Sequence, residues 1–144
     1  MTTMARIEVI LFLREVELFH FCTAEEILRI AGIVRERRFA AGETIYDIND
    51  AAEDLFCVVE GKVGQYGGEQ ETTHLGPGVA FGYLEILSGR RRDLRVVADE
   101  DTLVLAINED DFFDLLSNNI DIVKSLFRHM ACIFMDSPQR SISQ

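Results

Sequence analysis

The segment from Phe81 to Arg92 combines three features that together can bind a phosphate. Gly82 has no side chain, so the backbone can approach a ligand closely there. The short helical turn expected after Gly82 would aim free amide groups at an anion. Arg92 carries a planar guanidinium that can pair with two phosphate oxygens at once. We therefore predict that this segment binds a phosphate-bearing molecule.

Four arginines fall within six residues of this acidic chain, whose formal net charge is -11: Arg90, Arg91, Arg92 and Arg95. Arg90 and Arg91 are interpreted as solvated side chains, and Arg92 as the anion-binding one. Because affinity for a phosphate backbone comes mainly from summed Lys and Arg charge, we predict no direct binding to nucleic acid or to an anionic membrane. A second basic run is interpreted as an exposed strand face without a ligand: Arg35, Arg37 and Arg38.

The other reactive residues form no catalytic or metal-binding pattern. The three histidines lack the spacing of metal ligands, and no Ser, Cys or Lys has the setting of a nucleophile. We therefore predict a protein that is not an enzyme and has no metal and no cofactor. The cysteines are odd in number and far apart, so we interpret them as buried free thiols. These residues are His20, His74 and His129, and Cys22, Cys57 and Cys132.

The elements before the site begin with helices. Residues 4–12 are apolar around most of a helix, and residues 15–19 are expected to form a connecting turn that packs inward. Thr23 followed by Glu26 is the spacing of a capping box, which predicts a helix that ends near Gly32.

Between Val34 and Ile107 short β-prone runs alternate with turn pairs such as Gly67-Gly68, which predicts many short antiparallel strands in a sandwich or barrel. In the last run, 102–107, alternation predicts one face in the core and a milder second face.

Two helices are predicted after the strands, because Asn108 precedes three acidic residues and an apolar stripe extends from Ile122 to Phe134. Such a wide stripe requires a partner, either within the chain or in a second copy, so a homodimer through this helix is one reading. We expect one domain over residues 1–135 and a polar tail or linker over 136–144.

The 144 residues, 48% of them apolar, suit a single domain with its own core. Apolar runs are too short to span a membrane, and charged residues interrupt the N-terminal segment, unlike a signal peptide. We therefore expect no contact with a membrane and a cytoplasmic location.

The chain resembles the cyclic-nucleotide-binding domain family, whose phosphate-binding cassette reads roughly Phe-Gly-Glu-Leu-Ala-Leu-Leu, four residues, then Arg-Ala-Ala-Thr-Val. Here the cassette corresponds to 81–96, and three earlier stretches match the family in order: 39–46, 55–63 and 75–78. The resemblance covers nearly all of 12–144. It implies a mainly β fold with flanking helices, an eight-stranded antiparallel β-roll or jelly roll with helices at both ends.

The resemblance also implies the ligand, cyclic AMP or cyclic GMP, and the residues that bind it. Arg92 would hold the cyclic phosphate, Gly82 and Leu84 would offer backbone groups, and the final helix would cap the pocket or form a dimer. The candidate ligand-binding residues are Phe81, Gly82, Tyr83, Leu84, Arg92 and Asp93.

Two departures from the family affect this site. Tyr83 replaces the Glu that accepts a hydrogen bond from the ribose 2′-hydroxyl, a loss of roughly 1.5 to 3 kcal/mol. Small residues after the arginine are replaced by Asp93 and Leu94. Asp93 would either place a negative charge beside the phosphate, pair with Arg92, or point away. Glu85 is not expected to replace the missing carboxylate, because residues two apart on a helix do not share a face.

Three functions remain open at this point. The first is a regulatory domain that senses a small phosphate-bearing ligand, with weakened binding of cyclic nucleotides. The second is a degenerate fold that binds no nucleotide and serves as a dimerisation or interaction platform. The third is the effector part of a catabolite-activator-like transcription regulator, separated from its DNA-binding part, so the chain could belong to a larger regulated protein.

Overall fold

The computed structural model describes residues 3–68 and 71–137. Helices come first: α1 (Arg6–Arg14), a 3-10 turn (Glu17–Phe19) and α2 (Ala24–Ala31). The predicted capping box of α2 is confirmed, since Thr23 Oγ1 accepts from the Glu26 amide at 3.2 Å and Glu26 Oε1 accepts from the Thr23 amide at 2.9 Å. The connecting turn packs inward as expected, and three of its apolar side chains are buried: Val16, Leu18 and Phe19.

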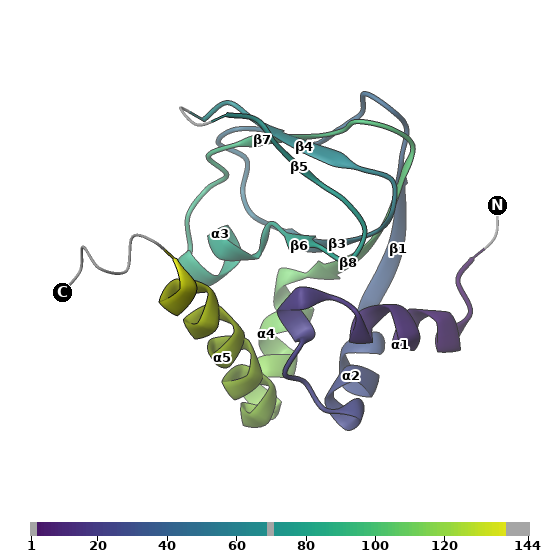
Figure 1. Cartoon of the computed structure of the whole chain (residues 1–144), viewed down its shortest axis with the longest axis vertical. Coiled ribbons are helices and arrows are strands. Elements are labelled where there is room, and N and C mark those ends of the chain that lie inside the picture. The colour runs from purple at the N-terminus through teal and green to yellow at the C-terminus, as the bar shows by residue number, and fades with distance from the viewer. Residues whose placement is uncertain (1–2, 69–70, 138–144) are drawn as a thin grey trace.

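Eight antiparallel strands then form two four-stranded sheets, as predicted (Figure 1). One sheet has the order β1-β8-β3-β6 and the other β2-β7-β4-β5. Their bounds are β1 (Val34–Phe39), β2 (Thr44–Tyr46), β3 (Asp54–Glu60), β4 (Val63–Tyr66), β5 (Thr73–Leu75), β6 (Ala80–Phe81), β7 (Arg95–Ala98) and β8 (Thr102–Asn108). The short helix α3 (Tyr83–Ser88) separates β6 from β7, and α4 (Glu109–Asn118) and α5 (Ile120–Asp136) follow the sheets.

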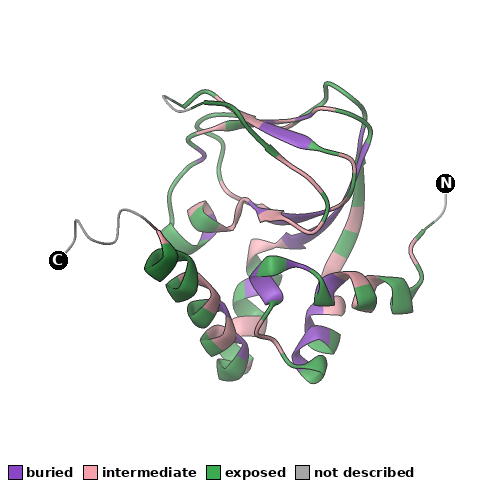
Figure 2. Cartoon of the chain, in the orientation of Figure 1, coloured by how far each residue is buried: buried purple, intermediate pink, exposed green. Residues whose placement is uncertain are grey.

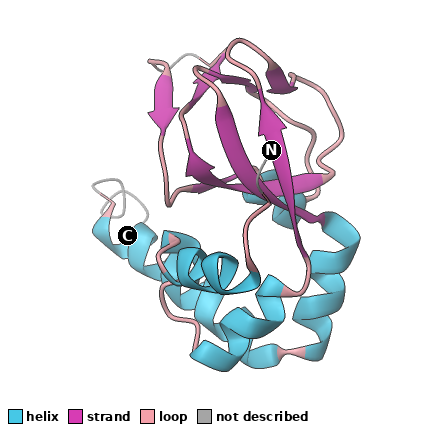
Figure 3. Cartoon of the chain, turned by 90° about the vertical axis from the view of Figure 1, so that its right-hand side faces the viewer, coloured by secondary structure: helices cyan, strands magenta, loops and turns pink. Residues whose placement is uncertain are grey.

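The helices other than α3 gather at one end of the β-roll, against the sheet that contains β8 (Figure 1). Figure 3 shows most of the helices on one side of the strands in a second view. This arrangement gives two cores. One lies between that sheet and the helices and includes Leu105 and Ile107. The other fills the inside of the roll and includes Val104 and Ala106. The prediction that β8 has a milder second face was wrong, because residues 102–107 are all buried.

The final helix buries only part of its apolar stripe. Ile122 and Leu126 are in the core, whereas five other apolar side chains of α5 are at least half exposed: Ile120, Phe127, Ile133, Phe134 and Met135. Much of this helix is coloured as exposed in Figure 2. The helix ends at Asp136, as predicted, and most of the expected tail lies outside the described residues. No helix in the described ranges has the length and apolar character that a membrane span requires.

The cysteines follow the prediction only in part. All three are free, but Cys132 is exposed on α5 and Cys22 is half-buried, so the expectation that all are buried was wrong. Burial raises the pKa of the Cys57 thiol to about 12 and that of Cys22 to about 11, which leaves both protonated near neutral pH.

Candidate ligand-binding site

A cavity of about 210 Å³ lies beside the beginning of α3, and we call it the α3 cavity. Five of the six predicted site residues line it, all except Arg92. The full lining is Tyr46, Gln65, Leu75, Val79, Ala80, Phe81, Gly82, Tyr83, Leu84, Glu85, Asp93 and Leu94. The residues on either side of α3 therefore line one hollow, and their role in binding a ligand stays a prediction.

Gly82 is required by the chain path into α3. It adopts φ 82°, a left-handed conformation that residues with a Cβ rarely take. A Cβ at this position would also lie 3.2 Å from Arg92 Nη1 and 3.4 Å from the Asp54 carbonyl oxygen. The missing side chain thus lets the Arg92 guanidinium pack directly beneath the backbone of this turn.

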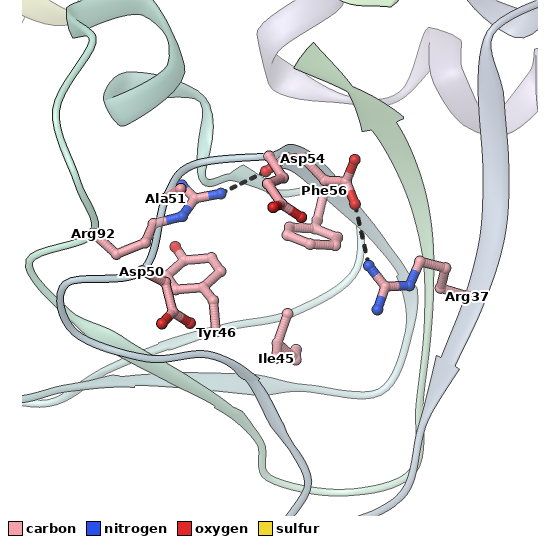
Figure 4. Close-up of a pocket in the computed structure, with 9 residues that line it drawn as sticks. Arg37, Ile45, Tyr46, Asp50, Ala51, Asp54, Phe56 and Arg92 are labelled. Atoms are coloured by element: carbon pink, nitrogen blue, oxygen red, sulfur yellow. Dashed lines mark hydrogen bonds and ion pairs between the residues drawn. The ribbon is translucent and has the colours of Figure 1, made fainter. Parts of the chain in front are cut away.

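Arg92 is bound by groups of the protein itself. Its side chain is 2% exposed, and Nη1 donates to Glu85 Oε1 at 2.5 Å and to the Gly82 carbonyl at 2.7 Å. Nη2 donates to the Asp54 carbonyl at 2.6 Å (Figure 4). The guanidinium also lies over the Tyr46 ring, 3.9 Å from its centroid. Among the buried side-chain polar atoms that the structure describes, Arg92 Nε alone lacks a partner.

The Glu85 contact was not anticipated. Glu85 lines the α3 cavity together with Tyr83 but binds Arg92, and the expectation that it does not replace the missing ribose carboxylate stays a prediction. Helix spacing applies only to residues within α3. Gly89 ends that helix with φ 72°, and the chain then turns back toward it. This return brings Arg92 back to Glu85 and leaves Asp93 exposed on the cavity wall, so Arg92 pairs with Glu85 rather than Asp93.

A second cavity, of about 300 Å³, contains Arg92, and we call it the arginine cavity. Its lining is Arg37, Ile45, Tyr46, Asp50, Ala51, Glu53, Asp54, Phe56 and Arg92 (Figure 4). Arg37 was interpreted as an exposed strand residue without a ligand. Its side chain is 41% exposed, yet it also donates to Asp54 Oδ2 at 3.2 Å within this cavity.

The tyrosines near the two cavities add no charge at neutral pH. Burial is the main cause that raises the pKa of both Tyr46 and Tyr83 above the ordinary value. Glu85 and Asp93 are the acidic residues of the α3 cavity, and its described lining contains no Lys, Arg or His. The hollow therefore has a mixed lining of apolar and acidic side chains.

His74 lies on β5 and has a partner in the turn after β7. His74 Nδ1 lies 2.6 Å from Asp99 Oδ2, and Tyr66 donates to the same carboxylate at 2.8 Å. Within the described residues, no group of three or more His, Cys, Asp or Glu side chains could hold a metal ion.

Comparisons with known proteins agree with the fold. The family model for the cyclic nucleotide-binding domain matches residues 36–119. The cyclic AMP receptor protein of Thermus thermophilus is 33% identical over 104 residues, which are 69% of this chain and 48% of the receptor. The chain thus spans about half the length of this curated relative.

Solved structures extend the likeness. The regulatory subunit of a cAMP-independent protein kinase A from Trypanosoma cruzi, bound to guanosine, has a TM-score of 0.71 and 28% identity over 83% of this chain and 44% of that one. The N-terminal domain of a transcriptional regulator from Streptomyces coelicolor has a TM-score of 0.75 at 22% identity, over 89% of this chain and 95% of that one. With the family model covering more than half of its residues, the chain belongs to the cyclic nucleotide-binding domain family.

Proposed function

We propose that this chain is a non-catalytic regulatory domain that takes a small nucleotide-like ligand in the α3 cavity. The observation that carries the proposal is the hollow itself, which lies at the family's cassette position and is neither filled by Tyr83 nor closed by Leu94. The proposed contacts come from Phe81, Gly82, Tyr83 and Leu84 on one wall and Asp93 on another. Arg92 supports this wall from behind.

Binding of cyclic AMP or cyclic GMP is proposed to be weak. Tyr83 stands where the family has a carboxylate for the ribose, and Arg92 is already paired with Glu85. A cyclic phosphate would have to break this buried pair before it could use the guanidinium. The T. cruzi relative, described as cAMP-independent and bound to guanosine, supports a family member with altered ligand preference.

A thermal-shift titration tests this function. Cyclic AMP, cyclic GMP, adenosine and guanosine are added to the chain, and at least one is expected to raise the melting temperature. A ligand at 100 times its dissociation constant stabilises the folded state by about 2.7 kcal/mol. Leu94→Trp, which fills the cavity, should abolish the shift.

The matched control is Leu87→Trp, because Leu87 lies on α3 but lines neither the α3 cavity nor the arginine cavity. This variant should retain the shift. No shift with any of the four compounds at millimolar concentration would contradict the proposal and leave the interaction platform as the function.

The exposed apolar side chains of α5 favour that platform as a second candidate. Phe127, Ile133 and Phe134 are 65%, 52% and 54% exposed, so this helix offers an apolar face to a second copy of the chain. Sedimentation at increasing concentration should show a dimer that Phe127→Glu dissociates. A monomer at all concentrations would contradict the homodimer.

The position of the domain in a larger protein is also a proposal. We infer that it acts in the cytoplasm as the effector part of a regulator, as the matched half of the T. thermophilus relative suggests. With a net charge of -11, this part is not expected to bind nucleic acid directly.

A further inference from the structure

We infer that the α3 cavity prefers an uncharged nucleoside to a cyclic nucleotide, an inference that rests on the proposed function. The first observation is the charge of the lining. Glu85 and Asp93 place two carboxylates on the cavity, and its described lining contains no basic side chain. Because Arg92 compensates the charge of Glu85, an anionic ligand would be repelled mainly by Asp93.

The second observation is the state of Arg92. Glu85 Oε1 lies 2.5 Å from Arg92 Nη1, and the carbonyl groups of Gly82 and Asp54 accept from the same guanidinium. The Glu85 carboxylate thus provides the negative charge that a ligand phosphate would otherwise bring. Because the guanidinium is almost fully buried, a phosphate could reach it only by displacing Glu85.

The arginine cavity offers an anion no easier approach to Arg92. Its two arginines are outnumbered by three carboxylates: Asp50, Glu53 and Asp54. Asp54 is itself paired with Arg37 at 3.2 Å and with Arg35 at 3.5 Å. Both hollows beside this guanidinium therefore carry more acidic than basic side chains.

The remaining features suit a base and a sugar. Carboxylates accept hydrogen bonds from hydroxyl groups, so Glu85 and Asp93 can hold ribose hydroxyls. Tyr46 and Phe81 supply aromatic surface for a planar base. The volume of about 210 Å³ is below the usual 300–1,000 Å³ of small-molecule pockets, which favours the smaller ligand that lacks a phosphate.

Isothermal titration calorimetry tests the inference with two matched pairs, guanosine with cyclic GMP and adenosine with cyclic AMP. In the unmodified chain, we expect at least one nucleoside to bind tenfold or more tightly than its cyclic nucleotide. Glu85→Gln removes one charge and frees Arg92, so the ratio of the two affinities should fall at least tenfold. The control Glu100→Gln removes an exposed carboxylate that lines neither cavity, and it should leave the ratio unchanged.

Glu85→Gln leaves the buried Arg92 without its counter-charge, so this variant could fail to fold. A second variant tests the inference in that case. Asp93 is exposed and does not contact this pair, so Asp93→Asn should fold normally and lower the same ratio severalfold. Tighter binding of the cyclic nucleotides by the unmodified chain would overturn the inference but leave the proposed function intact. If no compound binds the unmodified chain or either variant, the proposed function and the inference both fail.

Discussion

Tyr46 lines two cavities that differ in what surrounds them. The α3 cavity has a mixed lining, largely apolar, with two carboxylates and no basic side chain in its described part. The arginine cavity is polar and contains both Arg37 and Arg92. In this chain the family arginine keeps its place in the sequence but has its guanidinium bound by protein groups. A family motif therefore locates the hollow, whereas the ionic partners of the arginine determine which ligand charge the hollow can accept.

The largest expected effect on stability comes from Arg92. Its side chain lines the arginine cavity and binds Glu85, which lines the α3 cavity. Arg92→Met should lower the free energy of unfolding by about 3 to 5 kcal/mol, because it leaves Glu85 and the carbonyl groups of Gly82 and Asp54 without their donor. Urea denaturation followed by circular dichroism measures this change.

The control is Arg90→Met, since Arg90 is exposed and the same substitution there should change stability by less than about 0.5 kcal/mol. Equal small effects at both positions would show that the buried contacts of Arg92 do not stabilise the fold.

A smaller effect is expected where the backbone passes over the guanidinium. Gly82 and Gly89 both have positive φ, so alanine is strained at either position by about 1 to 2 kcal/mol. A Cβ at Gly89 meets nothing within 4 Å, whereas one at Gly82 meets Arg92. Gly82→Ala should therefore destabilise the chain by about 1 kcal/mol more than Gly89→Ala in thermal denaturation. Equal losses would mean that Arg92 moves aside without cost.

The smallest effect is expected at Arg37, the partly exposed arginine of the same cavity. Its ion pair with Asp54 joins a side chain that is 41% exposed to one that is 12% exposed. Arg37→Met should cost less than about 1 kcal/mol, and the difference should shrink in high salt. A loss as large as that of Arg92→Met would remove the contrast between the buried and the exposed arginine.

Local sequence signals predicted the fold well. The capping box at Thr23 and the helix start at Asn108 each depend on neighbouring residues, and the structure places both as expected. The second face of β8 could not be predicted in this way. The side chains of this face are buried because β1 and β3 flank the strand and Val63 and Val96 of the other sheet pack against it inside the roll, an arrangement set by distant segments.

The candidate site was predictable in position but not in its ionic contacts. The order of Phe81, Gly82 and Arg92 located the hollow and the helix beside it. The partner of Arg92 depends on the turn at Gly89 and on two backbone bonds, from the Arg92 amide to the Asp50 carbonyl and from the Asn49 amide to the Arg92 carbonyl. Helix spacing alone contains no information on such a return of the chain.

The junction between β8 and α4 has a mechanical consequence. Asn108 is both the last residue of the strand and the cap of the helix, and the Glu109 amide donates to the Glu53 carbonyl at 2.8 Å. Residue 53 immediately precedes Asp54, whose carbonyl holds Arg92. The Arg92 guanidinium and the first residue of α4 are thus connected through the adjacent residues Glu53 and Asp54. Loss of the Arg92 bond to the Asp54 carbonyl would therefore loosen the same backbone segment that anchors the start of α4.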